Sequence, residues 1–313
     1  MTIPAFHRST LVAPRLKVLY TPTAKVACTT IKWMLAEAEG TLNLDVIPRL
    51  LPAIVHRSQT IHNRKVHGLT RLIDLPEREI VNILSSPEWI RMAALRDPVA
   101  RSYSAWENRV FMRASGHVPD VERLSPDVLI DGRIDMTASF AAFAVALRDH
   151  TSSFMRDHHF IPQSTVVQPN IINYDMLVRV DEAGAIDRIA SLLSERSGRR
   201  IEPQRHNESM GVPLQRACSR PSAGIIHHVY RSDYEVFGFA PTEFAESPEH
   251  FVLSESETQL VALVRQSIER VNSVSRAAQM KMSARYGLRQ VRKALMRKVT
   301  FGRRYNTARE LHW

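Results

Sequence analysis

Residues 16–40 read LKVLY-TPTAKVAC-TTIKWMLAEAEG, and their pattern indicates the fold class. Leu16–Tyr20 is a short apolar run, which is typical of a buried strand. Thr29–Gly40 begins with threonine, ends with glycine and places apolar side chains at helical spacing, namely Ile31, Met34, Leu35 and Ala38. A strand, a polar loop and a helix in this order predict a βα unit.

The loop between this strand and helix has features of a phosphate-binding loop. A loop that opens a helix presents backbone N–H groups and the positive end of the helix dipole. Lys25 in the loop, with Thr29, Thr30 and Lys32 at the helix start, adds side-chain donors. The loop contains no glycine and no G-x-x-x-x-G-K-[ST] motif, which disfavours an ordinary ATP or GTP site. The alternative is a plain turn capped by Thr29.

A second strand and helix follow the same scheme. Trp89–Leu95 (WIRMAAL) predicts a buried strand that leads into Arg96-Asp97-Pro98 and a helix ending near Met112. A guanidinium at a strand end can bind a phosphate through two parallel hydrogen bonds. Ser104, about two turns into the helix, could reach the same anion. The alternative is that Arg96 pairs with Asp97 or a helix end and that Ser104 is simply exposed.

The remaining pattern predicts an α/β fold. Met176–Val180 is a third strand candidate, and helices are expected at Pro76–Leu84, Thr137–Leu147, Glu182–Arg196, Ala223–Phe237 and Glu255–Val274, with a polar loop at Gly116–Asp135. Strands that alternate with helices favour a mostly parallel central sheet with helices on both faces. Ligands of such sheets bind beyond the carboxyl ends of the strands, so Lys25 and Arg96 are expected in one site.

Composition excludes several classes of protein. The chain has 313 residues and two cysteines, Cys28 and Cys218, which is too few for a disulfide framework or a cysteine-rich zinc module. It has no apolar run of about 18 residues, as a transmembrane helix needs. The first 20 residues lack the apolar stretch of a signal peptide, so we expect a cytoplasmic location.

Together these motifs resemble the carbohydrate sulfotransferases, especially the branch with the chondroitin 4-O- and heparan sulfate 2-O-sulfotransferases. The phosphosulfate loop of that family reads approximately PKVACTNWK, and residues 24–32 read AKVACTTIK. Its 3′-phosphate motif reads approximately RDPFERLVSAY, and residues 96–106 read RDPVARSYSAW. Residues 157–163 (DHHFIPQ), 174–178 (YDMLV) and 230–239 (YRSDYEVFGF) are similar to its later motifs. The departures are Ala24 for proline, Thr30 for asparagine and Phe160 for tryptophan.

The resemblance implies a P-loop-like three-layer fold and a sulfotransferase that uses 3′-phosphoadenosine 5′-phosphosulfate. The implied acceptor is a hydroxyl of a carbohydrate, a glycolipid or another small molecule. Negative charge grows on the leaving oxygen in such a transfer, and Lys25 is the residue expected to stabilise it. The expected donor-binding residues are Lys25, Val26, Ala27, Cys28, Thr29, Thr30, Lys32, Arg96 and Ser104. We interpret Cys28 as a small residue that lets the phosphate approach.

The acceptor hydroxyl must lose a proton, and histidine is a suitable base near neutral pH. His67 is the first candidate because related enzymes have their catalytic histidine between the two motifs. His159 is the second, because it falls on the family's H-W position. Either ring could instead be structural. The adjacent pairs His158-His159 and His227-His228 do not have zinc-site spacing, so no metal is expected.

The excess positive charge lies at the C-terminus. Residues 276–313 contain 11 Lys and Arg and one acid, which accounts for the whole formal charge of +10. We therefore expect a domain over residues 1–275 that does not bind nucleic acid, followed by a basic tail over residues 276–313. Leu288, Val291, Leu295 and Val299 recur at helical spacing among basic residues, which suits peripheral contact with an anionic membrane at its inner face. The alternatives are a helix packed on the domain and a disordered end.

Two other function classes stay open from the sequence. A nucleotide-dependent kinase could use a related sheet, although the missing Walker glycines and the motif at Arg96 argue against it. A non-catalytic, membrane-peripheral protein could retain the same fold.

Overall fold

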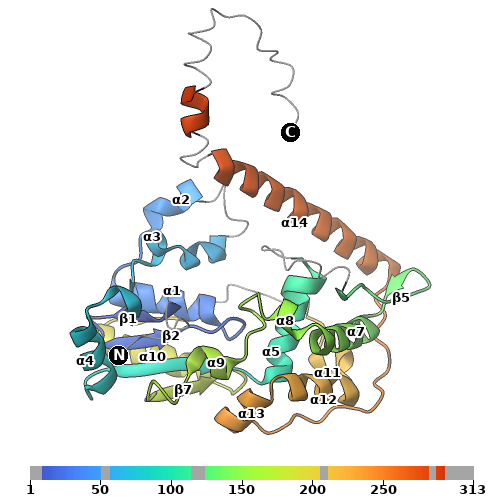
Figure 1. Cartoon of the computed structure of the whole chain (residues 1–313), viewed down its shortest axis with the longest axis horizontal. Helices are drawn as coiled ribbons and strands as arrows, with labels where there is room; N and C mark the ends of the chain where they lie inside the picture. Colours follow the sequence, from blue (N-terminus) through green and yellow to red (C-terminus); the bar gives the residue numbers. More distant parts are fainter. Residues whose placement is uncertain (1–8, 51–56, 114–123, 205–210, 282–286, 293–313) are drawn as a thin grey trace, which may run out of the picture.

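The computed structural model describes residues 9–50, 57–113, 124–204, 211–281 and 287–292. Its centre is a five-stranded sheet in the order β3-β1-β2-β4-β7 (Figure 1). The strands are β1 (Leu11–Ala13), β2 (Val18–Thr21), β3 (Thr70–Arg71), β4 (Ile90–Leu95) and β7 (Met176–Arg179). β2 pairs in parallel with β4, and β4 with β7, whereas β1 is antiparallel to both β2 and β3. The predicted α/β class is confirmed, and the three predicted strands form its parallel half.

Two short strands extend the sheet beyond what the sequence predicted. β1 has three residues and β3 has two, which is too short for a hydrophobic alternation to be recognised. A tight turn joins β1 to β2, in which the backbone N–H of Lys17 donates to the Pro14 carbonyl over 3.2 Å. These strands cover the edge of β2 and leave its carboxyl end beside that of β4.

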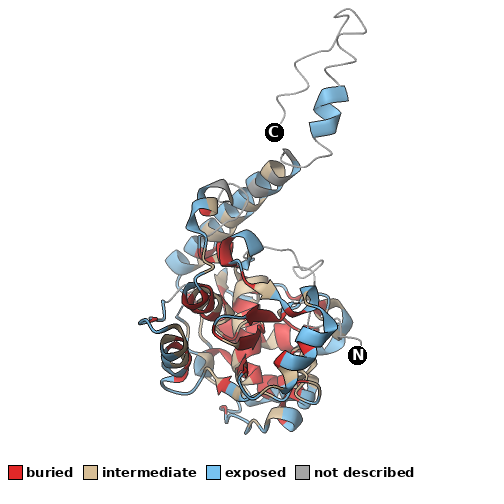
Figure 2. Cartoon of the chain, turned by 90° about the vertical axis from the view of Figure 1, so that its left-hand side faces the viewer, coloured by how far each residue is buried: buried red, intermediate tan, exposed pale blue. Residues whose placement is uncertain are grey.

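Helices cover both faces of the sheet. Val18 and Tyr20 pack in one apolar core with α1 (Cys28–Glu39) and α10 (Ala185–Ser197). Leu19, which lies between them in β2, packs on the opposite face against α4 (Glu77–Ser85). Figure 2 shows the buried residues gathered at the centre, between these layers. The alternation of β2 side chains therefore produces the predicted arrangement of a sheet between helices.

A second core is largely helical and aromatic. It joins α5 (Pro98–Ala105), the π-helix η6 (Trp106–Phe111), α7 (Met136–Asp149) and α12 (Arg220–Val229). The Trp106 ring lies 5.2 Å from that of Phe140 and 6.4 Å from that of Phe143, measured between centroids. The predicted helix that ends near Met112 is thus α5 continued by η6. This core anchors the helix that follows Arg96.

The helix predicted at Ala223–Phe237 is two helices, α12 and α13 (Arg231–Phe237). The chain bends at Tyr230, whose buried hydroxyl donates to the Phe160 carbonyl over 2.8 Å. The predicted polar loop at Gly116–Asp135 contains a small hairpin, β5 (Leu129–Ile130) and β6 (Arg133–Ile134), while positions 116–123 lie outside the described residues.

The last long helix, α14 (Glu255–Lys281), leaves the body of the protein. Near its start Val261 is buried, and Arg265 Nη2 donates to Asp127 Oδ1 over 3.0 Å. Beyond this anchor the helix runs from beside β5 toward the side of α2, continuing through residue 275, where we expect the domain to end (Figure 1). Within the described part of the chain, every helix is too short or too polar to span a membrane.

The basic tail is described only over a helical segment at 287–292. In this segment Leu288 is 70% exposed and Val291 is 57% exposed, so these two side chains do not pack on the domain. Leu295 and Val299, the other members of the predicted apolar face, lie outside the described residues.

Candidate active site

The loop after β2 has an unusual backbone for a segment without glycine. Lys25 and Ala27 both have left-handed conformations, with φ of 66° and 59°. Such a conformation costs a non-glycine residue about 1–2 kcal/mol. Ala27 is the N-cap of α1 and makes no side-chain capping bond, so the amides of the first turn face the loop without that cap. The turn that leads into α1 is therefore strained at two positions without glycine.

Lys25 lies among groups of both signs. Burial lowers its pKa to about 8, while Cys28 and Glu107 favour the charged form, and Arg96 and Arg109 oppose it. The groups other than Cys28 belong to residues after β4 and in the π-helix η6, so both elements lie near Lys25, which follows β2. Lys25 and Arg96 follow parallel neighbouring strands, in which Thr21 lies opposite Ala93. The expected juxtaposition of the two motifs is therefore present.

Arg96 is held at the end of β4 by its backbone and its side chain. Its Nε donates to Asp181 Oδ1 over 3.1 Å, and Asp181 Oδ2 also accepts from the Asp97 backbone over 2.6 Å. The partner of Arg96 is thus Asp181, in the turn after β7, and not Asp97. The Asp97 side chain caps α5 by accepting from Ala100 N over 2.9 Å. Ser104 is half-buried on the same helix.

Gln163 fixes the backbone of Arg96. Its Oε1 accepts from Arg96 N over 2.9 Å, and its Nε2 donates to Arg96 O over 2.8 Å. Gln163 is itself held by the buried Asp233, whose Oδ2 accepts from Gln163 N over 2.9 Å. The segments similar to the later family motifs therefore position the motif at Arg96.

His67 is buried in the short helix α3 (Arg64–His67). Its Nδ1 accepts a hydrogen bond of 3.0 Å from the Leu69 backbone, so the neutral ring has its proton on Nε2. Burial and the charges of Lys32 and Arg64 lower its pKa to about 4. In this arrangement Nε2 carries the proton and does not accept another one.

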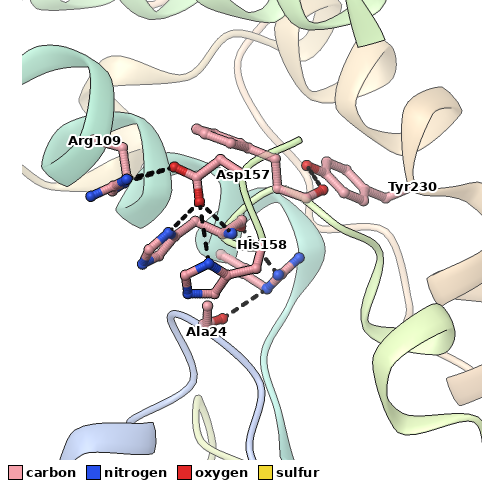
Figure 3. Close-up of polar contacts among 8 residues, drawn as sticks. Ala24, Arg109, Asp157, His158 and Tyr230 are labelled. Atoms are coloured by element: carbon pink, nitrogen blue, oxygen red, sulfur yellow. Dashed lines mark hydrogen bonds and ion pairs between the residues drawn. The ribbon is translucent and has the colours of Figure 1, made fainter. Parts of the chain in front are cut away.

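His159 has the opposite arrangement, because its Nδ1 contacts an acid. Nδ1 lies 2.5 Å from Asp157 Oδ1, and Arg109 Nη2 donates to Asp157 Oδ2 over 2.7 Å. Figure 3 shows the Asp157 carboxylate between Arg109 and His158. Although burial opposes ionisation, the bond from His159 and the charge of Arg109 hold the Asp157 pKa below its usual range. The carboxylate thus keeps the His159 proton on Nδ1 and leaves the Nε2 lone pair to accept another proton.

Arg101 connects His159 to the loop after β2. This buried arginine of α5 donates from Nε to the Ala24 carbonyl over 3.0 Å and from Nη2 to the His159 carbonyl over 3.1 Å (Figure 3). The two hydrogen bonds hold the loop and the histidine segment in a fixed relation. Arg101 lies five residues after Arg96 in the RDPVAR motif, but the sequence pattern alone did not indicate this role.

His62 is a second residue that the sequence analysis missed. It lies at the end of η4 (Arg57–His62), in a stretch with no clear periodicity. Its ring lies between two residues of α1, with Nδ1 3.2 Å from Lys32 Nζ and Nε2 3.3 Å from Thr29 Oγ1. Of the expected donor-binding residues, Val26 is fully buried, and Thr30 Oγ1 donates to the Gln204 carbonyl over 3.2 Å.

Asp157, His158 and His159 have the chemistry of metal ligands. One ligand atom from each lies within 4.8 Å of the others. Asp157 already pairs with Arg109, and Lys32 and Arg101 lie close enough to disfavour charge on His158. Such a cationic surrounding opposes a divalent cation and favours anions. Metal-free chemistry therefore stays our prediction.

Comparison with known families agrees with this geometry. A family model described as "Sulfotransferase family" matches residues 8–240. This range includes the strands of the sheet, Lys25, Arg96 and His159, and ends before α14. No curated protein and no solved structure matches the chain. Because the family model covers more than half of the chain, the chain belongs to the sulfotransferase family.

Proposed function

We propose that the protein transfers a sulfuryl group from 3′-phosphoadenosine 5′-phosphosulfate to a hydroxyl of a carbohydrate, a glycolipid or another small acceptor, on a P-loop-like fold. The observation on which this rests is the pair of cationic strand ends, Lys25 after β2 and Arg96 after β4, at one edge of the sheet. This donor has phosphates at two separate positions, and two neighbouring cationic groups suit it. The family supports sulfuryl transfer in general.

The loop and the start of α1 would hold the 5′-phosphosulfate. The amides of Cys28, Thr29 and Thr30 begin the helix, where the dipole favours an anion. Arg96, with Ser104 on α5, would hold the 3′-phosphate, which ATP lacks. Asp181 contacts Nε on one side of the Arg96 guanidinium, which orients the group.

The donor supplies a sulfuryl group whose bond to the 5′-phosphate oxygen breaks as the acceptor oxygen attacks. His159 Nε2 accepts the proton of the acceptor hydroxyl, and Asp157 stabilises the resulting imidazolium. Lys25 donates to the oxygen that leaves sulfur, where negative charge grows. Protein cations perform the role that Mg²⁺ has in many phosphoryl transfers.

His159 replaces His67 as our preferred base. The hydrogen bond from Leu69 N occupies the Nδ1 lone pair of His67, so the ring proton lies on Nε2. We propose that His67 orients an oxygen of a substrate through this Nε2–H.

A panel of nucleotides tests the donor. Thermal unfolding should be shifted upward most by 3′-phosphoadenosine 5′-phosphate, and less by ATP, ADP or AMP, because only the first has a 3′-phosphate. At 100 times its Kd a ligand stabilises by about 2.7 kcal/mol, which is easily measured. An equal shift with ATP would contradict the roles of Arg96 and Ser104 and favour a kinase. Turnover of radiolabelled donor then separates an enzyme from a non-catalytic binding protein.

We propose a peripheral contact with the inner face of an anionic membrane for the C-terminal part. Side chains of α14 expose an apolar stripe at spacings close to helical turns, with exposed fractions of 57% for Leu260, 59% for Leu263, 41% for Val271 and 65% for Val274. The basic residues of 276–313 follow it, and basic residues near an anionic surface contribute about 1 kcal/mol each.

A truncation that keeps α14 whole tests this contact. A chain ending at Lys281 keeps the apolar stripe but lacks most of the basic residues, so it should bind vesicles of phosphatidylcholine with phosphatidylglycerol much more weakly, while its affinity for 3′-phosphoadenosine 5′-phosphate stays unchanged. Binding by the full chain should weaken as salt rises, because the Debye length shortens. Equal vesicle binding by both chains would contradict the membrane contact of the tail.

A further inference from the structure

His62 contacts two residues that the proposed donor site uses, although it lies outside the donor loop itself. The η4 segment that ends in His62 packs on α1, where Trp33 Nε1 donates to the Ser58 carbonyl over 3.2 Å. Thr60 and Ile61, which precede His62, are fully buried. The backbone that presents the ring is therefore well anchored on the helix that binds the donor.

The partners of His62 determine where its proton lies. An ammonium group has only donors, so Lys32 Nζ must donate to Nδ1, which lies 3.2 Å away. The neutral ring then has its proton on Nε2, and this N–H faces Thr29 Oγ1 at 3.3 Å. His62 thus accepts from one residue of the first turns of α1 and donates to another.

The surroundings keep the ring in this neutral form. Burial, followed by the charge of Lys32 and by the neighbouring His158, His159 and His67, lowers the pKa of His62 to about 3. A protonated ring could not accept from Lys32. The contact with Lys32 therefore lasts while the ring is neutral and Lys32 is charged, and burial lowers the Lys32 pKa as well.

We propose that His62 is a positioning residue of the donor site, which directs the Lys32 ammonium and the Thr29 hydroxyl toward the 5′-phosphosulfate. Lysine has a long flexible side chain, and a fixed acceptor restricts its ammonium to one direction. This inference rests on the proposed donor. It predicts that His62 contributes to affinity through Lys32 and not through the stability of the fold.

Two substitutions of His62 distinguish its contact with Lys32 from its contact with Thr29. In His62→Asn the amide oxygen lies near the position of Nδ1 and can still accept from Lys32. In His62→Gln the amide nitrogen lies near the position of Nε2 and can still donate to Thr29. If Lys32 is the main partner, the Asn variant should retain more affinity for 3′-phosphoadenosine 5′-phosphate than the Gln variant, and His62→Ala should lose about tenfold. His228→Ala, an exposed histidine on α12, is the matched control.

A double-mutant cycle with Lys32→Ala decides the question, with Kd measured by calorimetry and thermal stability measured in parallel. The His62→Ala loss should largely disappear when Lys32 is already alanine, because interacting residues are not additive. Equal losses in both backgrounds, or an unchanged Kd, would overturn the role of His62 while the donor assignment stands. Failure of the wild-type protein to bind this nucleotide would instead overturn the donor assignment and the inference together. Nitrogen NMR of the ring, which needs no ligand, should show the proton on Nε2, and a proton on Nδ1 would contradict the proposal.

Discussion

The guanidinium of Arg101 donates to the backbone carbonyl of Ala24 over 3.0 Å, which ties the helix after β4 to the loop after β2. A second hydrogen bond, to the His159 carbonyl, makes this arginine a bridge between the proposed donor loop and the proposed base. A lysine has the same charge but lacks the planar fork needed to reach both carbonyls. Arg101→Lys should therefore lower turnover at least about tenfold, and it should cost about 1–3 kcal/mol of unfolding free energy for the buried carbonyl left unpaired. Denaturant unfolding and donor turnover measure the two effects.

Arg188→Lys is the matched control for this change, because Arg188 is an exposed arginine paired with Glu182 on the surface. This variant should change neither the turnover nor the free energy of unfolding. Full activity of Arg101→Lys would mean that the bridge is not needed for the reaction.

Lys25→Ala should lower turnover by about 10²-fold or more, because the charge on the leaving oxygen loses a donor that contributes roughly 3 kcal/mol. Lys17→Ala is an informative control, since Lys17 also has a left-handed backbone, with φ of 52°, but lies at the opposite end of β2 and pairs with Glu88. Both variants place alanine in a left-handed conformation, so they differ only in whether the lysine removed lies in the proposed donor site. Comparable losses of turnover in the two variants would assign the effect to the backbone.

Arg96→Ala should weaken the binding of 3′-phosphoadenosine 5′-phosphate by about 1.5–3 kcal/mol, because one charged hydrogen-bonding partner of the 3′-phosphate is removed. The affinity for AMP, which has no 3′-phosphate, should change little. Calorimetry with both nucleotides measures the difference, and Arg231→Ala on the exposed part of α13 is the control. Equal weakening for the two nucleotides would place Arg96 elsewhere than at the 3′-phosphate.

His159→Gln should lower turnover by about 10²-fold or more and leave the affinity for 3′-phosphoadenosine 5′-phosphate nearly unchanged, because a general base acts on the acceptor proton. Gln retains much of the volume of the ring but cannot accept the proton. A fully active variant would exclude His159 as the base and return the role to His67 or to a group other than histidine.

The pH dependence follows from two shifted pKa values. The proposed base, His159, would act when neutral, and burial lowers its pKa to about 4, so kcat/KM should rise as the pH rises through about 4. In its proposed role Lys25 would act when protonated, and burial lowers its pKa to about 8, so kcat/KM should fall as the pH rises through about 8. A profile of kcat/KM over this range checks both limbs. A limb near 6.5, the pKa of an unperturbed histidine, would contradict a buried base.

The sequence predicted the parallel half of the sheet and the neighbouring positions of Lys25 and Arg96, because both depend on local apolar runs and on a general property of parallel strands. It could not predict β1 or β3, whose few residues give no periodicity. The partner of Arg96 was also out of reach, since Asp181 lies 85 residues further along the chain. His62 was missed for a similar reason, because its segment has no pattern that would place it against α1.

The hydrogen bonds of Gln163 determine the order in which parts of the structure can form during synthesis. Arg96 is fixed by Gln163, 67 residues later, and Gln163 is held by Asp233, another 70 residues later. At a synthesis rate of 5–20 residues per second, Asp233 is added about 7 to 27 seconds after Arg96. During translation β2 and β4 can therefore pair and α1 can pack on them before the contact that fixes Arg96 exists, so the nascent chain gains these parts of its sheet first and the complete proposed anion site only when α13 has left the ribosome.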